Sequence, residues 1–461
     1  MTSIQAVQSQ IAESSAEAVV ASALQKAHAD THNTFLNIME HSALERARQV
    51  DRGDIIGPLA GVPFAVKDNF LTHEVPTTAA SNFLEDFVSP LQATAVKKLE
   101  AQGAICIGKV NLDAFAHGGS TENSAFGVTK NAVDETRVAG GSSGGSAVAV
   151  ALDIVPFALG TDTGGSIRQP ASFNGVVGLK PTYGAVSRYG VVAMASGTDT
   201  IGVLSSTVGD AELLMTFLSG QDARDMTTLP DFFSLDEQNN GKKLGVIKEF
   251  MGEGVDEQVR ARIEAAVEQY KTLGYDVEEV SLPLLKYAIA IYYTVIPAEI
   301  SSNLARYDGV RYGTQKGKDG SLTDVYELSR HAGFVQENKR RIIIGNYVLS
   351  SGFFDAYYQK AQKARTLLIN EFTTLFAEYD ALLGPVSPSP AFTIGESVDD
   401  PLEVYLRDVM TVPASLAGLP ALSVPVGATD SGLPVGLQII GARKSDAKIL
   451  AIAREIEGKN E

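Results

Sequence analysis

The sequence predicts an α/β fold built on a central sheet, and three observations indicate it. Short apolar runs of strand length occur at residues 63–66 and 104–108, with a helical pattern at 89–102 between them. The same order of strand and helix returns at 243–248 and 257–273. Such alternation is typical of proteins in which helices cover a sheet. Further buried strands are expected at residues 155–159, 381–383, 421–425 and 437–440.

The two predicted helices of this pattern carry signals at both ends. Residues that favour helix termini flank them: Ser89, Pro90 and Gly103 for the first, and Asp256 and Gly274 for the second. Apolar residues at helical spacing give each helix one buried face: Ala93, Val96 and Leu99 in the first, and Val259, Ile263, Val267 and Tyr270 in the second.

Two further regions are expected to be mainly helical. Residues 1–56 form a polar, alanine-rich N-terminal segment, and residues 284–377 form a helical insertion. A third short helix is expected at 147–152. Because no linker divides the sequence, we expect one catalytic domain over residues 1–461.

The composition limits what this chain contacts directly. Its formal net charge is −17 at pH 7, so any nucleic acid is expected to be held by a more basic partner. Neither an apolar run of the roughly 20 residues that span a bilayer nor a signal-peptide pattern is present. The single cysteine, Cys106, lies in an apolar run and is expected to be a buried strand residue. These features together predict a cytoplasmic protein.

Two glycine-rich turns, residues 140–146 (GGSSGGS) and 162–166 (DTGGS), are the strongest candidates for a site. Phosphate binding is disfavoured, because neither the P-loop pattern nor Gly-x-Gly-x-x-Gly opening a helix is present. An α/β-hydrolase is disfavoured as well. The first turn matches Gly-x-Ser-x-Gly, but the only histidine after Ser142 is His331, at an expected helix end.

A third mechanism needs no histidine, since a neutral lysine can activate a serine. Lys67 ends the apolar run at 63–66, so we expect it to be buried and its pKa to be lowered. Glycines in the turns let backbone N–H groups approach a developing oxyanion. These arguments do not rank the candidate serines, and a purely structural role for the turns stays open at this point. The candidates are Ser142, Ser143, Ser146 and Ser166.

Residues 140–181 resemble the amidase signature family. They contain GGSSGGS and then GTDTGGSIRQPA, and the separations of Lys67, Ser142 and Ser166 also match that family. The resemblance implies a mixed central β-sheet covered by helices on both faces. It also implies that Ser166 attacks an amide carbonyl, and that Ser142, entered through a cis peptide bond, relays a proton between Ser166 and Lys67. The oxyanion hole would be formed by the backbone amides of Thr163, Gly164, Gly165 and Ser166.

Stretches from about residue 55 to about 445 are similar to the family of A subunits of glutamyl-tRNA(Gln) amidotransferases. The similar stretches are 57–63, 120–127, 301–309, 339–342 and 351–358. This resemblance implies a glutaminase that supplies ammonia for converting Glu-tRNA(Gln) to Gln-tRNA(Gln). Arg341 would bind the glutamine carboxylate bidentately, Asp408 would bind the ammonium, and Tyr292 or Tyr293 would close the pocket. A location on a helix surface remains the alternative for Arg341 and Asp408.

The same resemblance implies a heterotrimer with B and C subunits. No cofactor or metal is expected in this chain, whereas ATP and magnesium are expected in the partner subunit that activates the charged tRNA. His28 and His32 have a spacing that can bind metal on a helix, but no third ligand is evident nearby. Two alternatives stay open: a stand-alone amidase acting on small or aryl amides, and a catalytically silent scaffold subunit.

Three residues depart from the family pattern. Ala114 stands where an acid is usual, His117 where an apolar residue is usual, and Gly119 where a serine is usual. They precede the stretch at 120–127, close to the expected pocket. We therefore expect them to affect substrate preference and not the triad.

Overall fold

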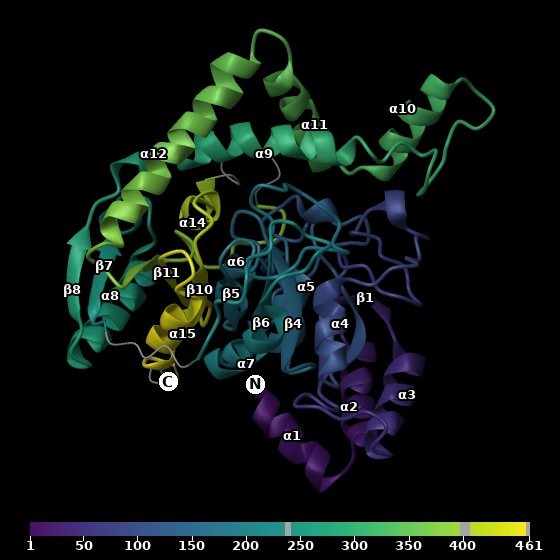
Figure 1. The fold of residues 1–461 in the computed structure, drawn as a ribbon, viewed down its shortest axis with the longest axis horizontal. Helices are drawn as coiled ribbons and strands as arrows, with labels where there is room; N and C mark the ends of the chain where they lie inside the picture. Colours follow the sequence, from purple (N-terminus) through teal and green to yellow (C-terminus); the bar gives the residue numbers. More distant parts are fainter. Residues whose placement is uncertain (236–240, 397–405, 458–461) are drawn as a thin grey trace.

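The computed structural model describes residues 1–235, 241–396 and 406–457, and eleven strands within them form one mixed sheet (Figure 1). The strands are β1 (Phe35–Ile38), β2 (Pro63–Lys67), β3 (Ile105–Val110), β4 (Phe157–Asp162), β5 (Val177–Lys180), β6 (Thr200–Ser205), β7 (Lys243–Ile247), β8 (Asp276–Val280), β9 (Ala381–Pro385), β10 (Ala421–Ala428) and β11 (Pro434–Gly441). Their order along the sheet is β1-β3-β2-β4-β6-β5-β10-β11-β9-β7-β8.

The sheet combines parallel and antiparallel pairs. Strand β2 is parallel to both β3 and β4, and β7 is parallel to both β8 and β9. The other pairs, including the long β10–β11 hairpin, are antiparallel. The mixed α/β sheet predicted from the sequence is therefore confirmed.

Helices cover both faces of the sheet. They are α1 (Ile4–Glu13), α2 (Ala16–His28), α3 (Glu40–Asp51), α4 (Thr94–Ala101), α5 (Gly144–Ala151), α6 (Arg168–Asn174), α7 (Val208–Leu218), α8 (Glu257–Thr272), α14 (Val412–Leu416) and α15 (Asp446–Arg454). Side chains of a strand alternate between the faces. In β2, Phe64 and Val66 join the core with α4 and α7, whereas Ala65 joins the core with α2, α3 and α5.

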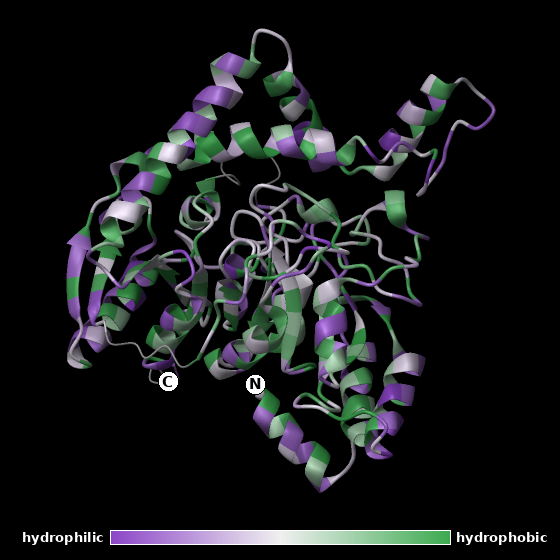
Figure 2. Ribbon diagram, viewed as in Figure 1, coloured by the Kyte–Doolittle hydropathy of each residue, from purple (hydrophilic) through white to green (hydrophobic). Residues whose placement is uncertain are grey.

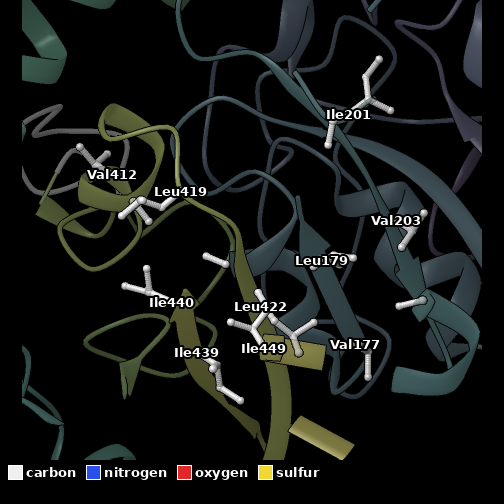
Figure 3. Packing of buried hydrophobic residues seen from close by; sticks show 14 of the residues in the cluster. Val177, Leu179, Ile201, Val203, Val412, Leu419, Leu422, Ile439, Ile440 and Ile449 are labelled. Carbon is white, nitrogen blue, oxygen red and sulfur yellow. The ribbon is translucent and has the colours of Figure 1, made fainter. Parts of the chain in front are cut away.

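The cores are apolar and continuous across neighbouring strands. Val177 and Leu179 of β5 lie near Leu422 of β10 and Ile439 of β11 in one such core (Figure 3). Figure 2 shows the central strands as mainly hydrophobic, whereas the edge strand β8 is mainly hydrophilic. This agrees with β8 exposing most of its residues. The centre of the sheet is thus a rigid support for whatever its loops carry.

A helical layer lies above the edge of the sheet, at the top of Figure 1. It consists of α9 (Ala288–Leu304), α10 (Leu322–Gly333), α11 (Gln336–Leu349), the π-helix η5 (Phe354–Gln359) and α12 (Lys360–Leu375). Helix α9 packs against α11, α12 and α14. The helical character predicted for residues 284–377 is confirmed.

Two predictions of local structure are wrong. The helix predicted at 89–102 begins only at Thr94, because the amides of Ala93 and Thr94 donate to the carbonyls of Leu71 and Tyr189 instead. Ser89 is therefore no helix cap, and its Oγ accepts a hydrogen bond from the Leu91 amide. The N-terminal segment also contains a strand, β1, which pairs with β3.

The other local elements agree with the sequence, with small shifts. Asp256 caps α8 by accepting from the amides of Gln258 and Val259. Helix α5 begins at Gly144, three residues before its predicted start. His28 ends α2 and His32 lies beyond it, so the two share no helix. None of the described helices is long and apolar enough to cross a membrane, and the described residues contain no His, Cys, Asp and Glu cluster that could hold a metal.

Candidate active site

Lys67 and the second glycine-rich turn meet where the strands β2 and β4 end, at the border of the sheet formed by the carboxyl ends of these strands. Lys67 is the last residue of β2, and Asp162, which opens the turn, is the last residue of β4. Because these neighbouring strands are parallel, their carboxyl ends lie at the same edge. The first glycine-rich turn leads into α5, which packs on both strands. The topology thus brings together Lys67, Ser142 and Ser166 from three separate parts of the chain.

The amino group of Lys67 is fully buried among hydroxyl groups. Its Nζ lies 2.8 Å from Ser142 Oγ, 2.9 Å from Ser143 Oγ and 2.9 Å from Thr161 Oγ1. Burial lowers the pKa of Lys67 to about 7, even though nearby carboxylates, Asp113 foremost, favour the charged form. A substantial fraction of Lys67 is therefore neutral near pH 7, which is the state that a base requires.

Backbone contacts hold the first turn against the second. The Gly141–Ser142 peptide bond is cis, as the family resemblance predicted. The Gly141 amide donates to Gln169 Oε1 at 2.9 Å, and the Ser143 amide donates to the carbonyl of Ser166 at 3.1 Å. A Cβ atom at Gly141 would lie 2.1 Å from Asp113 Oδ2, so only glycine fits there. Ser142 is consequently fixed next to Lys67.

A buried ion pair anchors the turn that carries Ser166. Asp162 and Arg168 are both fully buried, and two hydrogen bonds of 2.9 Å join them. Burial alone would raise the pKa of Asp162, but Arg168 holds it below its usual value. Arg168 also donates to the Thr411 carbonyl at 3.0 Å and to Gln438 Oε1 at 2.6 Å. The Ser166 side chain itself keeps 7% exposure.

The amides proposed for the oxyanion hole differ from one another. Among the described residues, nothing accepts a hydrogen bond from the amides of Thr163, Gly164 or Ser166. The Gly165 amide, in contrast, donates to Asp162 Oδ1 at 2.8 Å. Gly165 therefore shapes this turn, with a φ of +141° and its backbone close against the Thr411 side chain, and in this conformation it offers no free donor. Among the amides predicted for the oxyanion hole, those of Thr163, Gly164 and Ser166 are therefore the ones open to an acceptor within the described residues.

Two tyrosines of α9 connect the turn with the expected glutamine pocket. A Cβ atom at Gly164 would lie 2.7 Å from the Tyr292 hydroxyl, so Tyr292 packs directly on the turn. Tyr293 OH donates to Asp408 Oδ2 at 3.2 Å. The guanidinium of Arg341 lies over the Tyr293 ring, 5.4 Å from its centre. Tyr292 thus contacts the turn that carries Ser166, while Tyr293 contacts both Asp408 and Arg341.

The predicted pocket residues carry opposite charges and lie away from the open surface. Arg341 is 4% exposed, and its Nε donates to Glu337 Oε1 at 2.7 Å, so a location on a helix surface is excluded. Asp408 is half-buried. Burial raises the pKa of Asp408 to about 7, against the opposing effects of Arg341 and Tyr293. A cation placed beside Asp408 would restore its charge.

Two of the three residues that depart from the family pattern lie near Asp408 or Arg341. A Cβ atom at Gly119 would lie 3.5 Å from Asp408 Oδ1. His117 is fully buried, and burial, together with Arg341, lowers its pKa to about 3, so its ring is neutral. The Ala114 carbonyl accepts from Asn338 of α11 at 2.9 Å. Gly119 thus lies beside Asp408 and His117 near Arg341, while Ala114 contacts α11.

Sequence analysis missed three residues that fix the catalytic groups: Asn69, Thr161 and Gln169. Thr161 touches Lys67, and Asn69 donates to Thr161 Oγ1 at 3.2 Å. Asn69 and Thr161 also line a cavity of about 210 Å³ that includes Asp199. Asn69 follows Lys67 by two residues and the other two lie within the GTDTGGSIRQPA stretch, but nothing in their local pattern marks a role.

Comparison with known proteins agrees with this geometry. The Amidase family model matches residues 18–450. The A subunit of glutamyl-tRNA(Gln) amidotransferase from Lactiplantibacillus plantarum is 52% identical over 414 residues, which are 88% of this chain and 85% of that protein. The crystal structure of the A subunit from Thermotoga maritima aligns with a TM-score of 0.76 at 46% identity, over 88% of this chain and 85% of that one. A bacterial aryl acylamidase of the amidase signature family aligns with a TM-score of 0.84 at 26% identity, over 99% of this chain and 96% of that one.

Proposed function

Because the chain belongs to the amidase signature family, we propose that it releases ammonia from glutamine as the A subunit of a tRNA-dependent amidotransferase. The observation that carries the chemistry is the buried contact of 2.8 Å between Lys67 Nζ and Ser142 Oγ. The role predicted from the sequence, that of an A subunit, agrees with relatives such as the protein of Lactiplantibacillus plantarum.

The proposed reaction proceeds through two steps on Ser166. Neutral Lys67 takes the proton of Ser142, Ser142 takes the proton of Ser166, and Ser166 Oγ attacks the γ-amide carbon. The oxyanion that forms is stabilised by the free amides of the turn. The C–N bond then breaks, and the proton returns through Ser142 to the leaving nitrogen, which departs as ammonia. Water attacks the acyl-enzyme by the same relay and releases glutamate.

The pocket supports glutamine over a simple amide. Glutamine carries a carboxylate and an ammonium on one carbon, and the site offers Arg341 and Asp408 on either side of Tyr293. An aryl or small amide lacks the carboxylate and the ammonium that these two residues would bind. The aryl acylamidase of similar fold nevertheless keeps a stand-alone amidase as the second candidate. The intact arrangement of Lys67 and Ser142 speaks against a silent scaffold.

We further propose that the chain works in a heterotrimer with B and C subunits. ATP and magnesium would bind the partner that activates the charged tRNA, in the cytoplasm. The formal net charge of −17 supports this division, because a chain this acidic repels tRNA. The proposed tRNA substrate is Glu-tRNA(Gln), the one named for the relatives.

The test is ammonia release from L-glutamine by the purified chain, alone and with B and C subunits. Release that rises with the partners and vanishes in Ser166→Ala is the expected result. Hydrolysis of simple amides without glutamine hydrolysis would favour the stand-alone amidase. Ammonia release that is unchanged in Ser166→Ala would contradict the mechanism itself.

A further inference from the structure

Gln169 holds a buried hydrogen-bond donor that no described residue accepts. Its side chain is 2% exposed. Its Oε1 accepts from the Gly141 amide at 2.9 Å, but its Nε2 has no partner within residues 1–235, 241–396 and 406–457. Buried polar groups in native proteins are nearly always hydrogen-bonded. An exception next to a catalytic site therefore points to a ligand atom.

The contact with Gly141 decides which end of the carboxamide faces the site. An N–H donor can be met only by the carbonyl end of the glutamine side chain. If the carboxamide were rotated by 180°, its NH₂ group would face the Gly141 amide, and two donors cannot form a hydrogen bond with each other. The backbone of the first glycine-rich turn thus directs Nε2 of Gln169 away from Gly141.

The free nitrogen lies close to the carboxylate expected to bind the substrate ammonium. A Cβ atom at Gly119 would lie 3.5 Å from Gln169 Nε2 and also 3.5 Å from Asp408 Oδ1. The two atoms are therefore separated by at most twice that distance. Because residue 119 is glycine, it places no side chain between this neutral donor and the carboxylate acceptor.

We propose that Gln169 is a substrate-contacting residue whose Nε2–H donates to the α-carboxylate of the bound amino acid, beside the ammonium held by Asp408. This inference rests on the proposed glutaminase function and adds a second carboxylate donor to Arg341. An α-amino acid is the ligand class that fits, since it presents an acceptor and a cationic donor on one carbon. The short separation of Gln169 and Asp408 suits two groups joined in this way.

The contact also links substrate recognition with the catalytic turns. Gln169 lies three residues after Ser166 and holds Gly141, the residue before Ser142. A carboxylate bound at Nε2 polarises the carboxamide, and this strengthens its hold on Gly141. Binding of the correct head group therefore supports the turn that carries the proton relay.

The test uses two partial analogues of glutamine as competitors against glutamine hydrolysis by the complex with its B and C subunits. Glutaramate retains the carboxylate and lacks the ammonium, whereas 4-aminobutanamide retains the ammonium and lacks the carboxylate. In Gln169→Met, which removes the donor without adding a charge, the inhibition constant of glutaramate should rise about 10- to 100-fold relative to that of 4-aminobutanamide, as expected for a lost hydrogen bond to a charged group. In Asp408→Asn the reverse preference is expected.

Several results would overturn the assignment. An equal rise in both inhibition constants, no change in either, or a loss of kcat with an unchanged KM for glutamine would each exclude a contact with the carboxylate. Failure of either analogue to compete in the wild-type complex would exclude the assignment of the carboxylate to Gln169 and of the ammonium to Asp408. If Gln169→Met does not fold, Gln169→Glu keeps an oxygen for Gly141, and its added negative charge should make the selective rise larger. Failure of the proposed function is distinguishable, because the wild-type complex would then release no ammonia from glutamine.

Discussion

The edge of the sheet and the helical layer supply different halves of the site, and they are built differently. At the sheet edge, Lys67, Asp162 and Arg168 are fully buried, and the hydrogen-bond partners of Lys67 and Arg168, such as Ser142 and Gln438, are buried as well. The helical layer contributes Arg341 from α11 and Tyr292 from α9, while its outer surface carries large exposed apolar side chains. These include Ile343 at 68%, Tyr347 at 49%, Tyr357 at 46% and Leu367 at 56% exposure.

This difference separates the chemistry from the recognition of substrate. The groups that move protons are fixed inside the fold, so their positions depend on the folded core. The residues proposed to hold the substrate come from both regions: Arg341 stands on α11, whereas Gln169 lies in α6 next to the turn that carries Ser166. Substitutions in the proton relay or in the buried ion pair should therefore change kcat or stability, and substitutions of Arg341 or Asp408 should change KM. The following predictions test that division, from the largest expected effect to the smallest.

Ser166→Ala should abolish glutamine hydrolysis, with a loss of kcat of at least about 10⁴-fold, because removing the nucleophile of an acyl-transfer enzyme has effects of this order. The fold should be unaffected, since Ser166 contributes its carbonyl and not its hydroxyl to the contact with Ser143. Ammonia release under saturating glutamine measures the effect. Residual activity within about 100-fold of wild type would assign the nucleophile elsewhere.

Arg168→Met should destabilise the protein by about 3–5 kcal/mol, because it leaves Asp162 as an uncompensated buried charge. Denaturant unfolding measures the free energy of unfolding. Replacing both partners, in Arg168→Met with Asp162→Asn, should recover part of this loss. A single variant as stable as wild type would show that the sheet edge does not depend on this ion pair.

Lowering the pH should weaken catalysis and substrate binding through different groups. Lys67, with a pKa of about 7, acts as a base only when neutral, so kcat should fall about tenfold for each pH unit below 7. Asp408, with a pKa raised to about 7, binds an ammonium only when charged, so KM should rise over the same range. Separate profiles of kcat and KM measure this. Asp408→Asn should remove the dependence of KM and leave that of kcat; loss of both would contradict the division.

Arg341→Lys should raise KM for glutamine about tenfold with kcat within a factor of about three, because lysine cannot form the bidentate contact with a carboxylate. The neighbouring Arg340 is a matched control: it also pairs with Glu337, but its side chain is 37% exposed. Arg340→Lys should leave KM nearly unchanged. Equal effects of the two substitutions would remove Arg341 from the pocket.

Ile343→Ser should change the free energy of unfolding by less than about 0.5 kcal/mol, because Ile343 is 68% exposed on the outer surface of α11. Thermal unfolding of the isolated chain measures this. Phe372→Ser, on the buried face of α12, is the contrasting control and should be clearly destabilising. A large loss from Ile343→Ser would show that the outer surface stabilises the helical layer.

Local pattern predicted those elements whose reasons are local. Asp256 caps α8, and the apolar run before Lys67 forms the buried strand β2, because capping and strand burial depend on neighbouring residues. The burial of Lys67 and its lowered pKa followed from the same run. The cis bond before Ser142 and the placing of Arg341 near Asp408 came from the family resemblance and not from physical argument.

The features that sequence reasoning missed depend on distant partners. Strand β1 exists because β3 offers it a free edge, and α4 begins late because Leu71 and Tyr189 accept the amides before it. The Gly165 amide is not free because it donates to the Asp162 carboxylate within the same turn. Thr161 and Gln169 become important only once the sheet brings two glycine-rich turns together. None of these contacts leaves a periodicity or a motif in its own stretch of sequence.

The burial of Cys106 in β3 has a practical consequence for following the helical layer in solution. The thiol is 4% exposed, and burial raises its pKa to about 12, so it is almost entirely protonated at neutral pH. Thiolates, not thiols, react with maleimides. A cysteine introduced at Tyr347 or Leu367 can therefore be labelled selectively without replacing Cys106. A spectroscopic probe attached there would report directly on movement of α11 or α12 when glutamine or a partner protein binds.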